Sequence, residues 1–204
     1  NLSIPAGSFI GILGKTGSGK TTLANILAKF YEIPTGKIFF NDIDINDIER
    51  KSFYEKFAYV MQDDYIYDNT IKHNIELYKN YEKNEVKEAT KKAELFDTIE
   101  KLDKKYDTLI GDNGIKLSGG QKQRLILSRN LITNPNILII DNGFTGLDID
   151  TRKKVIDNLN NRNNKATLVI ISSMMEDIKN ADKIYKLENK TLVEINMEEE
   201  VYDA

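Results

Sequence analysis

The sequence of 204 residues contains no cysteine, so it has neither a disulfide framework nor a thiolate metal site. This composition is compatible with a reducing compartment. The sequence also lacks an apolar run close to the roughly 20 residues that cross a bilayer, and its N-terminus shows no signal-peptide pattern. Any role at a membrane must therefore come through a partner or through a segment outside this sequence.

An excess of positive charge is also missing. The 29 Lys and Arg residues and the 32 Asp and Glu residues give a net charge of -3, which offers no bulk electrostatic reason to bind nucleic acid or an anionic membrane. The one histidine, His73, lies within a helical stretch. We interpret it as a surface or packing residue rather than a catalytic one, and we expect no nucleic acid partner.

The chain starts at Asn1 rather than Met, and an apolar run begins only a few residues later. We therefore expect a domain of a longer polypeptide. With 40% hydrophobic residues, the chain can bury the core of one domain and has room for a subdomain.

Residues 14–22 hold a specific motif. Gly14, Gly19, Lys20 and Thr21 fit the spacing G-x-x-x-x-G-K-[ST], between a strand-like run and a helical pattern. The glycines let successive backbone N–H groups turn inward as a nest for phosphate oxygens, and the helix N-terminus favours the same anion. Lys20 would reach the β- and γ-phosphates, and the Thr21 hydroxyl would bind Mg²⁺. The predicted nucleotide site comprises Gly14, Thr16, Gly17, Ser18, Gly19, Lys20, Thr21 and Thr22.

Apolar runs and helical patterns alternate along most of the chain. Strand-like runs occupy residues 9–13, 37–40, 57–61, 136–140, 166–171, 183–187 and 191–195. Helical patterns occupy residues 21–30 and 148–159, and Asp47 is expected to cap a short helix that ends near residue 56. From residue 62 to about 135 the periodicity is helical, with amphipathic stretches at 84–96 and 121–133. This order predicts an α/β fold whose mainly parallel sheet is interrupted by a helical block.

A second motif, Leu117-Ser118-Gly119-Gly120-Gln121, stands directly before the helical stretch at 121–133. Its glycines, its hydroxyl and the free N–H groups of a helix entrance suit another anion contact. With this motif the sequence resembles the ATP-binding cassette (ABC) family, whose signature is Leu-Ser-Gly-Gly-Gln. The resemblance covers nearly the whole chain and includes the phosphate loop at 14–22, Gln62 at the Q-loop, the signature residues Ser118, Gly119, Gly120 and Gln121, the Walker B strand at 137–141, the D-loop at Leu147 and Asp148, residues 181–184, and an exporter-like X-loop at 110–114.

The resemblance implies a P-loop NTPase (RecA-like) fold with a small antiparallel β part and an inserted α-helical subdomain. The ATP-binding core would be residues 1–62 and 136–204, and the signature subdomain would be residues 63–135. ATP and Mg²⁺ are the implied cofactors. In this family pattern Thr21, Gln62 and Asp141 would hold the metal, and Gln62 would also sense the γ-phosphate.

The resemblance also implies partners. A second cassette would join head to tail, so that each ATP lies between the phosphate loop of one cassette and the signature of the other. Transmembrane domains, expected before residue 1 of the same polypeptide, would respond when the two cassettes close and part. The chain would then lie at the cytoplasmic face of the cell membrane.

The sequence departs from the family pattern at both catalytic positions. Where the family has a Glu after the Walker B Asp, this chain has Asn142, whose amide can hold a water but cannot accept its proton. Ser173 stands where the family has a switch His. Residues 143–146 also differ from the usual Pro-Thr-Ser-Ala, and no Tyr or Trp precedes Gly14 to stack on adenine. Because the signature is intact, we expect the degenerate subunit of an exporter heterodimer, which binds ATP and hydrolyses it poorly.

Two alternatives stay open at this point. One is a homodimeric ABC ATPase in which Asn142 and a positioned water support slow hydrolysis. The other is a soluble ABC-type regulator that uses ATP only as a dimerisation switch. The transported substrate lies outside the reach of the sequence, because in the family the transmembrane domains select it.

Overall fold

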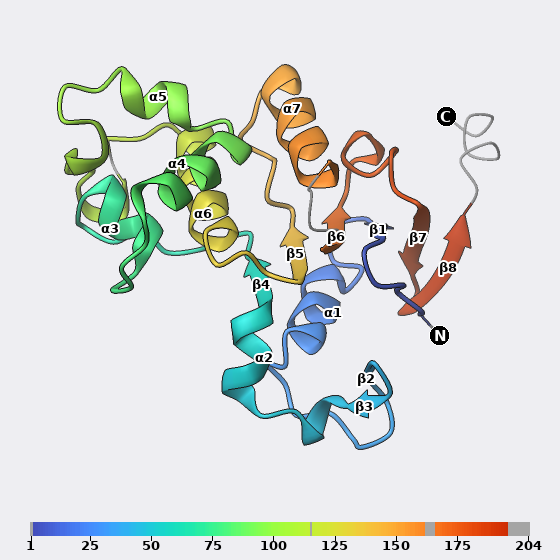
Figure 1. Cartoon of the computed structure of the whole chain (residues 1–204). Helices are drawn as coiled ribbons and strands as arrows, with labels where there is room; N and C mark the ends of the chain where they lie inside the picture. The colour runs from blue at the N-terminus through green and yellow to red at the C-terminus, as the bar shows by residue number, and fades with distance from the viewer. Residues whose placement is uncertain (1, 115, 162–165, 196–204) are drawn as a thin grey trace. The chain divides into compact units, whose positions relative to one another are not determined.

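The computed structural model describes residues 2–114, 116–161 and 166–195 (Figure 1). The chain divides into two compact units, each made of segments that are distant in the sequence. Unit 1 comprises Asn1–Tyr59, Pro135–Asn142 and Asn164–Ala204, and unit 2 comprises Val60–Asn134 and Gly143–Asn163.

Unit 1 is organised around a six-stranded sheet. Its strands are β1 Phe9–Leu13, β4 Phe57–Val60, β5 Ile137–Asp141, β6 Thr167–Ser172, β7 Lys183–Glu188 and β8 Thr191–Ile195. They lie in the order β4-β5-β6-β1-β7-β8 (Figure 1). Strand β1 pairs in parallel with β6 and with β7, β5 pairs in parallel with β6, and β8 pairs antiparallel with β7.

The central strands form because their residues are apolar on both faces. Every residue of β6 is buried, and so are the first four residues of β1. Strands covered on both faces read as continuous apolar runs rather than alternating ones. The core of unit 1 contains Ile10, Ile12, Ala24, Ala28, Phe53, Phe57, Ile139, Val169, Ile171, Tyr185 and Leu187.

Two helices and a hairpin complete unit 1 (Figure 1). The carboxyl end of β1 leads through residues 14–19 into the first helix. The helices are α1 Lys20–Leu27 and α2 Arg50–Lys56, the antiparallel hairpin strands are β2 Phe39–Phe40 and β3 Ile43–Asp44, and short 3-10 turns cover Ile45–Asp47 and Met175–Asp177.

Unit 2 is helical. Its helices are α3 Ile71–Glu76, α4 Lys83–Lys92, α5 Phe96–Glu100, α6 Gly119–Leu131 and α7 Ile149–Asn160, with 3-10 turns at Lys105–Asp107 and Asp112–Gly114. Helix α6 packs against both α3 and α4, and α4 also packs against α5 and α7. Buried side chains on α6, among them Leu125, Leu127 and Leu131, form this contact.

The α/β class, the mainly parallel sheet and the small antiparallel part are confirmed, but several predicted boundaries are wrong. The predicted helix at 84–96 is two helices, because Glu94 between them adopts a left-handed backbone with φ 56°. Helix α1 ends at Leu27 rather than near residue 30, since Lys29 takes φ 60°. Glu49, not Asp47, occupies the N-cap position of α2, without a side-chain capping hydrogen bond, and Asp47 ends a separate 3-10 turn.

The two units also differ from the predicted division. The predicted subdomain at residues 63–135 nearly coincides with Val60–Asn134, but unit 2 also includes Gly143–Asn163, which the sequence reading assigned to the core. In the part of the chain that the structure describes, none of the helices is long and apolar enough to cross a membrane.

Candidate functional site

The loop between β1 and α1 has the backbone shape of an anion nest. Gly17 and Gly19 adopt φ 82° and φ 101°, left-handed conformations that residues with a Cβ rarely take. A Cβ on Gly14 would lie 2.6 Å from Ser18 Oγ and 3.2 Å from the Lys20 stem, so a side chain here would displace both of these side chains. The Gly14 N–H donates to the Ser172 carbonyl over 3.1 Å, which ties the loop to the end of β6. The loop is thus held in a shape whose N–H groups can contact phosphate.

Lys20 begins α1 and is only 6% exposed. Its ammonium donates to the Gly14 carbonyl over 2.7 Å and to the Lys15 carbonyl over 3.0 Å. Burial lowers the pKa of this ammonium, and the negative charge of Asp141 opposes that shift. Both acceptors are neutral carbonyls, so a phosphate that enters the loop would be a stronger partner for the ammonium.

Asp141 is the last residue of β5 and is completely buried. Its Oδ1 accepts a long hydrogen bond of 3.5 Å from Asn142 Nδ2, and its Oδ2 has no hydrogen-bond partner among the described residues. Leaving a buried carboxylate oxygen without a partner is costly, so this atom is suited to a cation or to its bound water.

The residues in unit 1 fit a magnesium ion that is shared with a nucleotide. Mg²⁺ prefers oxygen ligands and is usually held by one or two protein oxygens together with waters and phosphates. Asp141 offers a buried carboxylate, and the exposed Thr21 hydroxyl lies in the first turn of α1. The described residues contain no cluster of three or more His, Cys, Asp or Glu that could hold a metal ion by themselves.

Asn142 and Ser173 follow the carboxyl ends of the neighbouring strands β5 and β6. Asn142 has φ 48°, and its N–H donates to the Ile171 carbonyl over 2.9 Å. Ser173 is exposed and directly follows Ser172, the residue that accepts the Gly14 N–H. Parallel α/β sheets bind ligands outside the carboxyl ends of their strands. Unit 1 therefore places Lys20, Asp141, Asn142 and Ser173 at one edge of the sheet.

The signature residues lie in unit 2, at the start of α6. Ser118 caps this helix: its Oγ accepts the Gln121 N–H over 3.2 Å, and its own N–H donates to Gln121 Oε1 over 2.9 Å. The helix begins at Gly119, two residues before the predicted start. Ser118 and Gly119 are exposed, which leaves the helix entrance open to a ligand from outside the chain.

Residues 145–147 pack tightly against the signature helix within unit 2. Gln123 Nε2 donates to Thr145 Oγ1 over 2.9 Å, and Gln123 Oε1 accepts the Gly146 N–H over 2.8 Å. A Cβ on Gly120 would lie 2.6 Å from the Gly146 carbonyl oxygen. The two segments meet backbone to backbone, and Gln123 clamps the contact with both ends of its amide.

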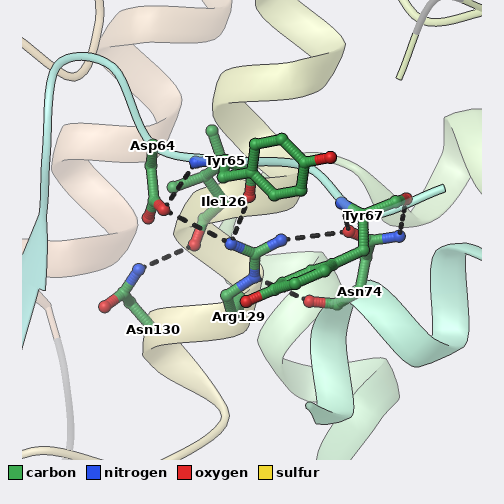
Figure 2. Close-up of polar contacts among 7 residues, drawn as sticks. All are labelled: Asp64, Tyr65, Tyr67, Asn74, Ile126, Arg129 and Asn130. Atoms are coloured by element: carbon green, nitrogen blue, oxygen red, sulfur yellow. Dashed lines mark hydrogen bonds and ion pairs between the residues drawn. The ribbon is translucent and has the colours of Figure 1, made fainter. Parts of the chain in front are cut away.

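Gln62 lies in unit 2, is exposed, and is the second residue of the loop that leads from β4 to α3. Figure 2 shows how the next residues are held by Arg129 of α6. The guanidinium donates to the Tyr65 carbonyl over 2.7 Å and lies 3.5 Å from Asp64 Oδ1. It also donates to the carbonyl and to the side-chain oxygen of Asn74, over 2.8 and 3.0 Å. Arg129 is 8% exposed, so this network fixes the loop after Gln62 from inside unit 2.

Unit 2 has exposed tyrosines within this loop and after α3. Tyr65 is 54% exposed, Tyr78 is 83% exposed, and Leu109 is 56% exposed. His73 is half-buried between two rings, with its centroid 6.4 Å from that of Tyr67 and 4.8 Å from that of Tyr78. Leu109 directly precedes the segment 110–114 and forms an antiparallel bridge with Thr70, the residue before α3.

Two polar residues that hold segments next to predicted site residues were not predicted from the sequence: Gln123 and Arg129. Their partners Thr145 and Asp64 lie 22 and 65 positions away in the chain. Contacts between residues so far apart leave no local pattern in the sequence. Only Gln123 could have been suspected, because it lies two residues after the signature.

Comparison with known proteins gives consistent results. The profile of a protein family described as "ABC transporter" matches residues 1–145. An "ATP-dependent lipid A-core flippase" of Haemophilus influenzae (strain ATCC 51907 / DSM 11121 / KW20 / Rd) is 35% identical over 207 residues, covering 96% of this chain and 35% of the relative. The "Beta-(1-->2)glucan export ATP-binding/permease protein NdvA" of Bartonella bacilliformis is 38% identical over 195 residues, covering 95% of this chain and 33% of the relative.

A solved structure is similar as well. "Structure of a bacterial Atm1-family ABC exporter with ATP bound" superposes with a TM-score of 0.89 at 33% identity, over 94% of this chain and 34% of the other. The chain spans about a third of the length of the relatives it matches.

Proposed function

The chain belongs to the ABC transporter family, and from that membership we propose that it binds ATP at residues 14–22 as the nucleotide-binding domain of an exporter. The observation that carries the proposal is Lys20, a residue that is 6% exposed and whose ammonium donates to carbonyls of a loop with left-handed glycines. Loop N–H groups and Lys20 would bind the phosphates, and Thr21, Asp141 and Gln62 would hold Mg²⁺. Bound Mg²⁺ would neutralise phosphate charge.

The signature residues Ser118, Gly119, Gly120 and Gln121 would act on a second cassette rather than on the chain's own ATP. The exposed entrance of α6 supports this, because a helix N-terminus with free N–H groups suits a phosphate brought by another subunit. The two cassettes would join head to tail and close around ATP. Their closing and opening would be passed to transmembrane domains of the longer protein.

The chain's own site would bind ATP and hydrolyse it poorly. An attacking water must lose a proton, and the amide of Asn142 has no basic site at neutral pH. The exposed Ser173 hydroxyl is no substitute for an imidazole as a group that exchanges protons near pH 7. The chain would then be the degenerate half of a heterodimer, whose intact signature completes the competent site of the other half.

The exposed aromatic surface of unit 2, formed by Tyr65, Tyr67, Tyr78 and Leu109, would receive the transmembrane part of the protein. Relatives named as ATP-binding/permease proteins are about three times as long as this chain, so a permease portion is available as the occupant. Contact with it would hold the chain at the cytoplasmic face of the membrane.

Substitution of Lys20 tests the ATP site. Lys20→Ala is expected to weaken ATP binding by about tenfold or more, because hydrogen bonds to charged groups contribute about 1.5–3 kcal/mol. Isothermal titration calorimetry on the chain measures this. The matched control Lys15→Ala removes an exposed lysine of the same loop and should bind ATP nearly as the unmodified chain does. Equal affinities for both variants would exclude residues 14–22 as the ATP site.

Cross-linking in the full-length protein tests the aromatic surface. A photoreactive amino acid at position 78 should form an adduct with the transmembrane part, because Tyr78 is 83% exposed. The same amino acid at position 54, where Tyr54 of unit 1 is 39% exposed, serves as the comparison. Adducts at position 54 and none at position 78 would place the contact elsewhere.

A further inference from the structure

The residues that follow β6 in unit 1 form a turn that is closed by two buried polar side chains. Ser172, the last residue of β6, is 2% exposed, and Asp177, the last residue of the 3-10 turn Met175–Asp177, is 4% exposed. The Ser172 Oγ donates to Asp177 Oδ2 over 2.5 Å, a short distance that is typical of a hydroxyl bonded to a carboxylate. Because both groups are buried, water does not compete for this hydrogen bond, and it ties the turn to the strand.

The same hydroxyl also fixes the backbone between the two residues. Ser172 Oγ accepts the Met174 N–H over 3.0 Å, so the serine side chain closes a short turn around Ser173. Within this turn the Asp177 N–H donates to the Met174 carbonyl over 3.2 Å. Ser173 and Met174 are exposed, but hydrogen bonds hold the backbone on both sides of them.

The segment that carries Asp177 is anchored to β1 as well. A Cβ on Gly11 would lie 2.6 Å from Ile178 Cβ, so Ile178 packs directly on the backbone of β1. Further along the chain, Asp182 Oδ2 accepts the Phe9 N–H over 2.7 Å, and the Asp182 N–H donates to the Phe9 carbonyl over 2.8 Å. The turn therefore has a fixed position along β1.

Ser172 connects this turn to the phosphate loop. Its carbonyl accepts the Gly14 N–H over 3.1 Å, and Gly14 is the first residue of the loop at 14–22. Since the hydroxyl and the carbonyl belong to one residue, a shift of Ser172 at the end of the strand would weaken the bond to Gly14. The phosphate loop thus rests on a residue whose own side chain is held by Asp177.

We propose that Asp177 is a positioning residue for the phosphate loop: its carboxylate holds the Ser172 hydroxyl, and Ser172 in turn holds Gly14 in the conformation that receives phosphate. This inference rests on the proposed ATP site. Asp177 would act through Ser172 and would not touch ATP itself.

Hydrogen exchange in the chain without ATP tests this support directly. Ser172→Ala removes the hydroxyl and keeps the carbonyl that accepts the Gly14 N–H. The exchange rate of the Gly14 N–H, measured by NMR, should rise by about tenfold, because its hydrogen bond opens more easily when the strand end is released. The Phe9 N–H, which is bonded to Asp182 at the other end of β1, should exchange at an unchanged rate.

ATP affinity, measured by calorimetry on the whole chain, tests the consequence for binding. Ser172→Ala should bind ATP about threefold to tenfold more weakly, the range for loss of one hydrogen bond. Asp177→Ala should show the same reduction, and the combined variant should lose no more than either, because the two side chains act as one unit. Asp177→Asn should retain more affinity than Asp177→Ala, since its amide oxygen can still accept the Ser172 hydroxyl proton.

Ser8→Ala is the matched control. The Ser8 hydroxyl donates to the Pro5 carbonyl over 2.6 Å, directly before β1 and away from the phosphate loop. Its removal should change neither the exchange of the Gly14 N–H nor the affinity for ATP. Thermal unfolding verifies that every variant is folded.

The outcomes separate this inference from the proposed function. Unchanged exchange at Gly14 in Ser172→Ala overturns the positioning role, and so does an equal rise at Gly14 and Phe9, which would be a general loss of stability. Additive losses of ATP affinity in the combined variant would also contradict it.

Normal ATP binding by Lys20→Ala would show instead that the ATP site itself is wrong, even where the exchange at Gly14 rises as expected. If Lys20→Ala loses ATP while Ser172→Ala and Asp177→Ala bind it as the unmodified chain does, only the role of Asp177 fails.

Discussion

At the scale of single residues, the chemistry depends on what each side chain can do with a proton. Asn142 occupies a left-handed backbone position with φ 48°, which asparagine tolerates better than most residues. Its amide can donate and accept hydrogen bonds, but it cannot take a proton from water. Lys20 and Asp141 in the same unit supply the ammonium and the carboxylate that nucleotide and metal binding use. Binding and hydrolysis can therefore be separated at one position.

Acid stability gives a prediction at the same scale. Asp44 accepts the Gly36 N–H over 2.5 Å and the Asn46 N–H over 2.8 Å, and these bonds lower its pKa. The folded chain then binds fewer protons at Asp44 than the unfolded chain, so this stabilisation is present above about pH 4 and is lost as the pH falls through the folded pKa.

Asp44→Asn should therefore lower the thermal unfolding midpoint at pH 7, and the difference from the unmodified chain should shrink as the pH falls below about 4. Asp42→Asn is the control, because Asp42 is exposed in the same hairpin. A difference that grows toward low pH would contradict the assignment.

At the scale of elements, the beginning of α6 depends on how closely the Gly143–Asn163 segment approaches it. Gly120 has no room for a side chain, because a Cβ would lie 2.6 Å from the Gly146 carbonyl oxygen. Gly119, its neighbour in the same helical turn, has nothing within 4 Å of the corresponding position. The packing of the fold therefore requires glycine at position 120, whereas it leaves room for a side chain at position 119.

Alanine substitutions should separate the two glycines. Gly120→Ala is expected to destabilise the chain by about 1–3 kcal/mol, because a backbone segment must shift. Gly119→Ala should be neutral or should stabilise by up to about 1 kcal/mol, since alanine favours a helix over glycine. Urea unfolding of both variants measures this. Equal effects would show that the close approach to Gly146 does not matter.

Element boundaries also mark where sequence-based prediction failed. The strands were predicted well because buried parallel strands are continuous apolar runs. The break between α4 and α5 was missed because Glu94, not a glycine, takes the left-handed conformation, and the Leu95 N–H then donates to the Thr90 carbonyl. Glutamate gives no sequence signal for such a turn.

At the scale of the whole molecule, the motif residues could be predicted from the sequence, but the residues that hold them in place through hydrogen bonds could not. A motif such as residues 14–22 is local, so its residues and their chemistry are visible in sequence. Arg129 and Gln123 act through partners from other elements, and only the fold brings these together. The family was also visible in sequence, and the match over residues 1–145 confirms it.

At this scale we propose that the two subunits differ in function: this chain binds ATP and hydrolyses it poorly, and its signature completes the competent site of the other subunit. Two copies of this chain would each offer an intact signature to the other. A low rate of hydrolysis would then have its cause at Asn142 and Ser173 rather than at the signature. Restoring both positions should restore chemistry without changing how ATP is bound.

The most direct test of whether Asn142 and Ser173 limit hydrolysis is a comparison of ATP turnover. It compares the unmodified chain with the Asn142→Glu, Ser173→His double variant. Both proteins should bind ATP with similar affinity, and the double variant should hydrolyse it about 100-fold faster, since general base catalysis contributes about 10²–10⁴-fold. Brisk hydrolysis by the unmodified chain, or equal slow rates for two proteins that both bind ATP, would contradict the account.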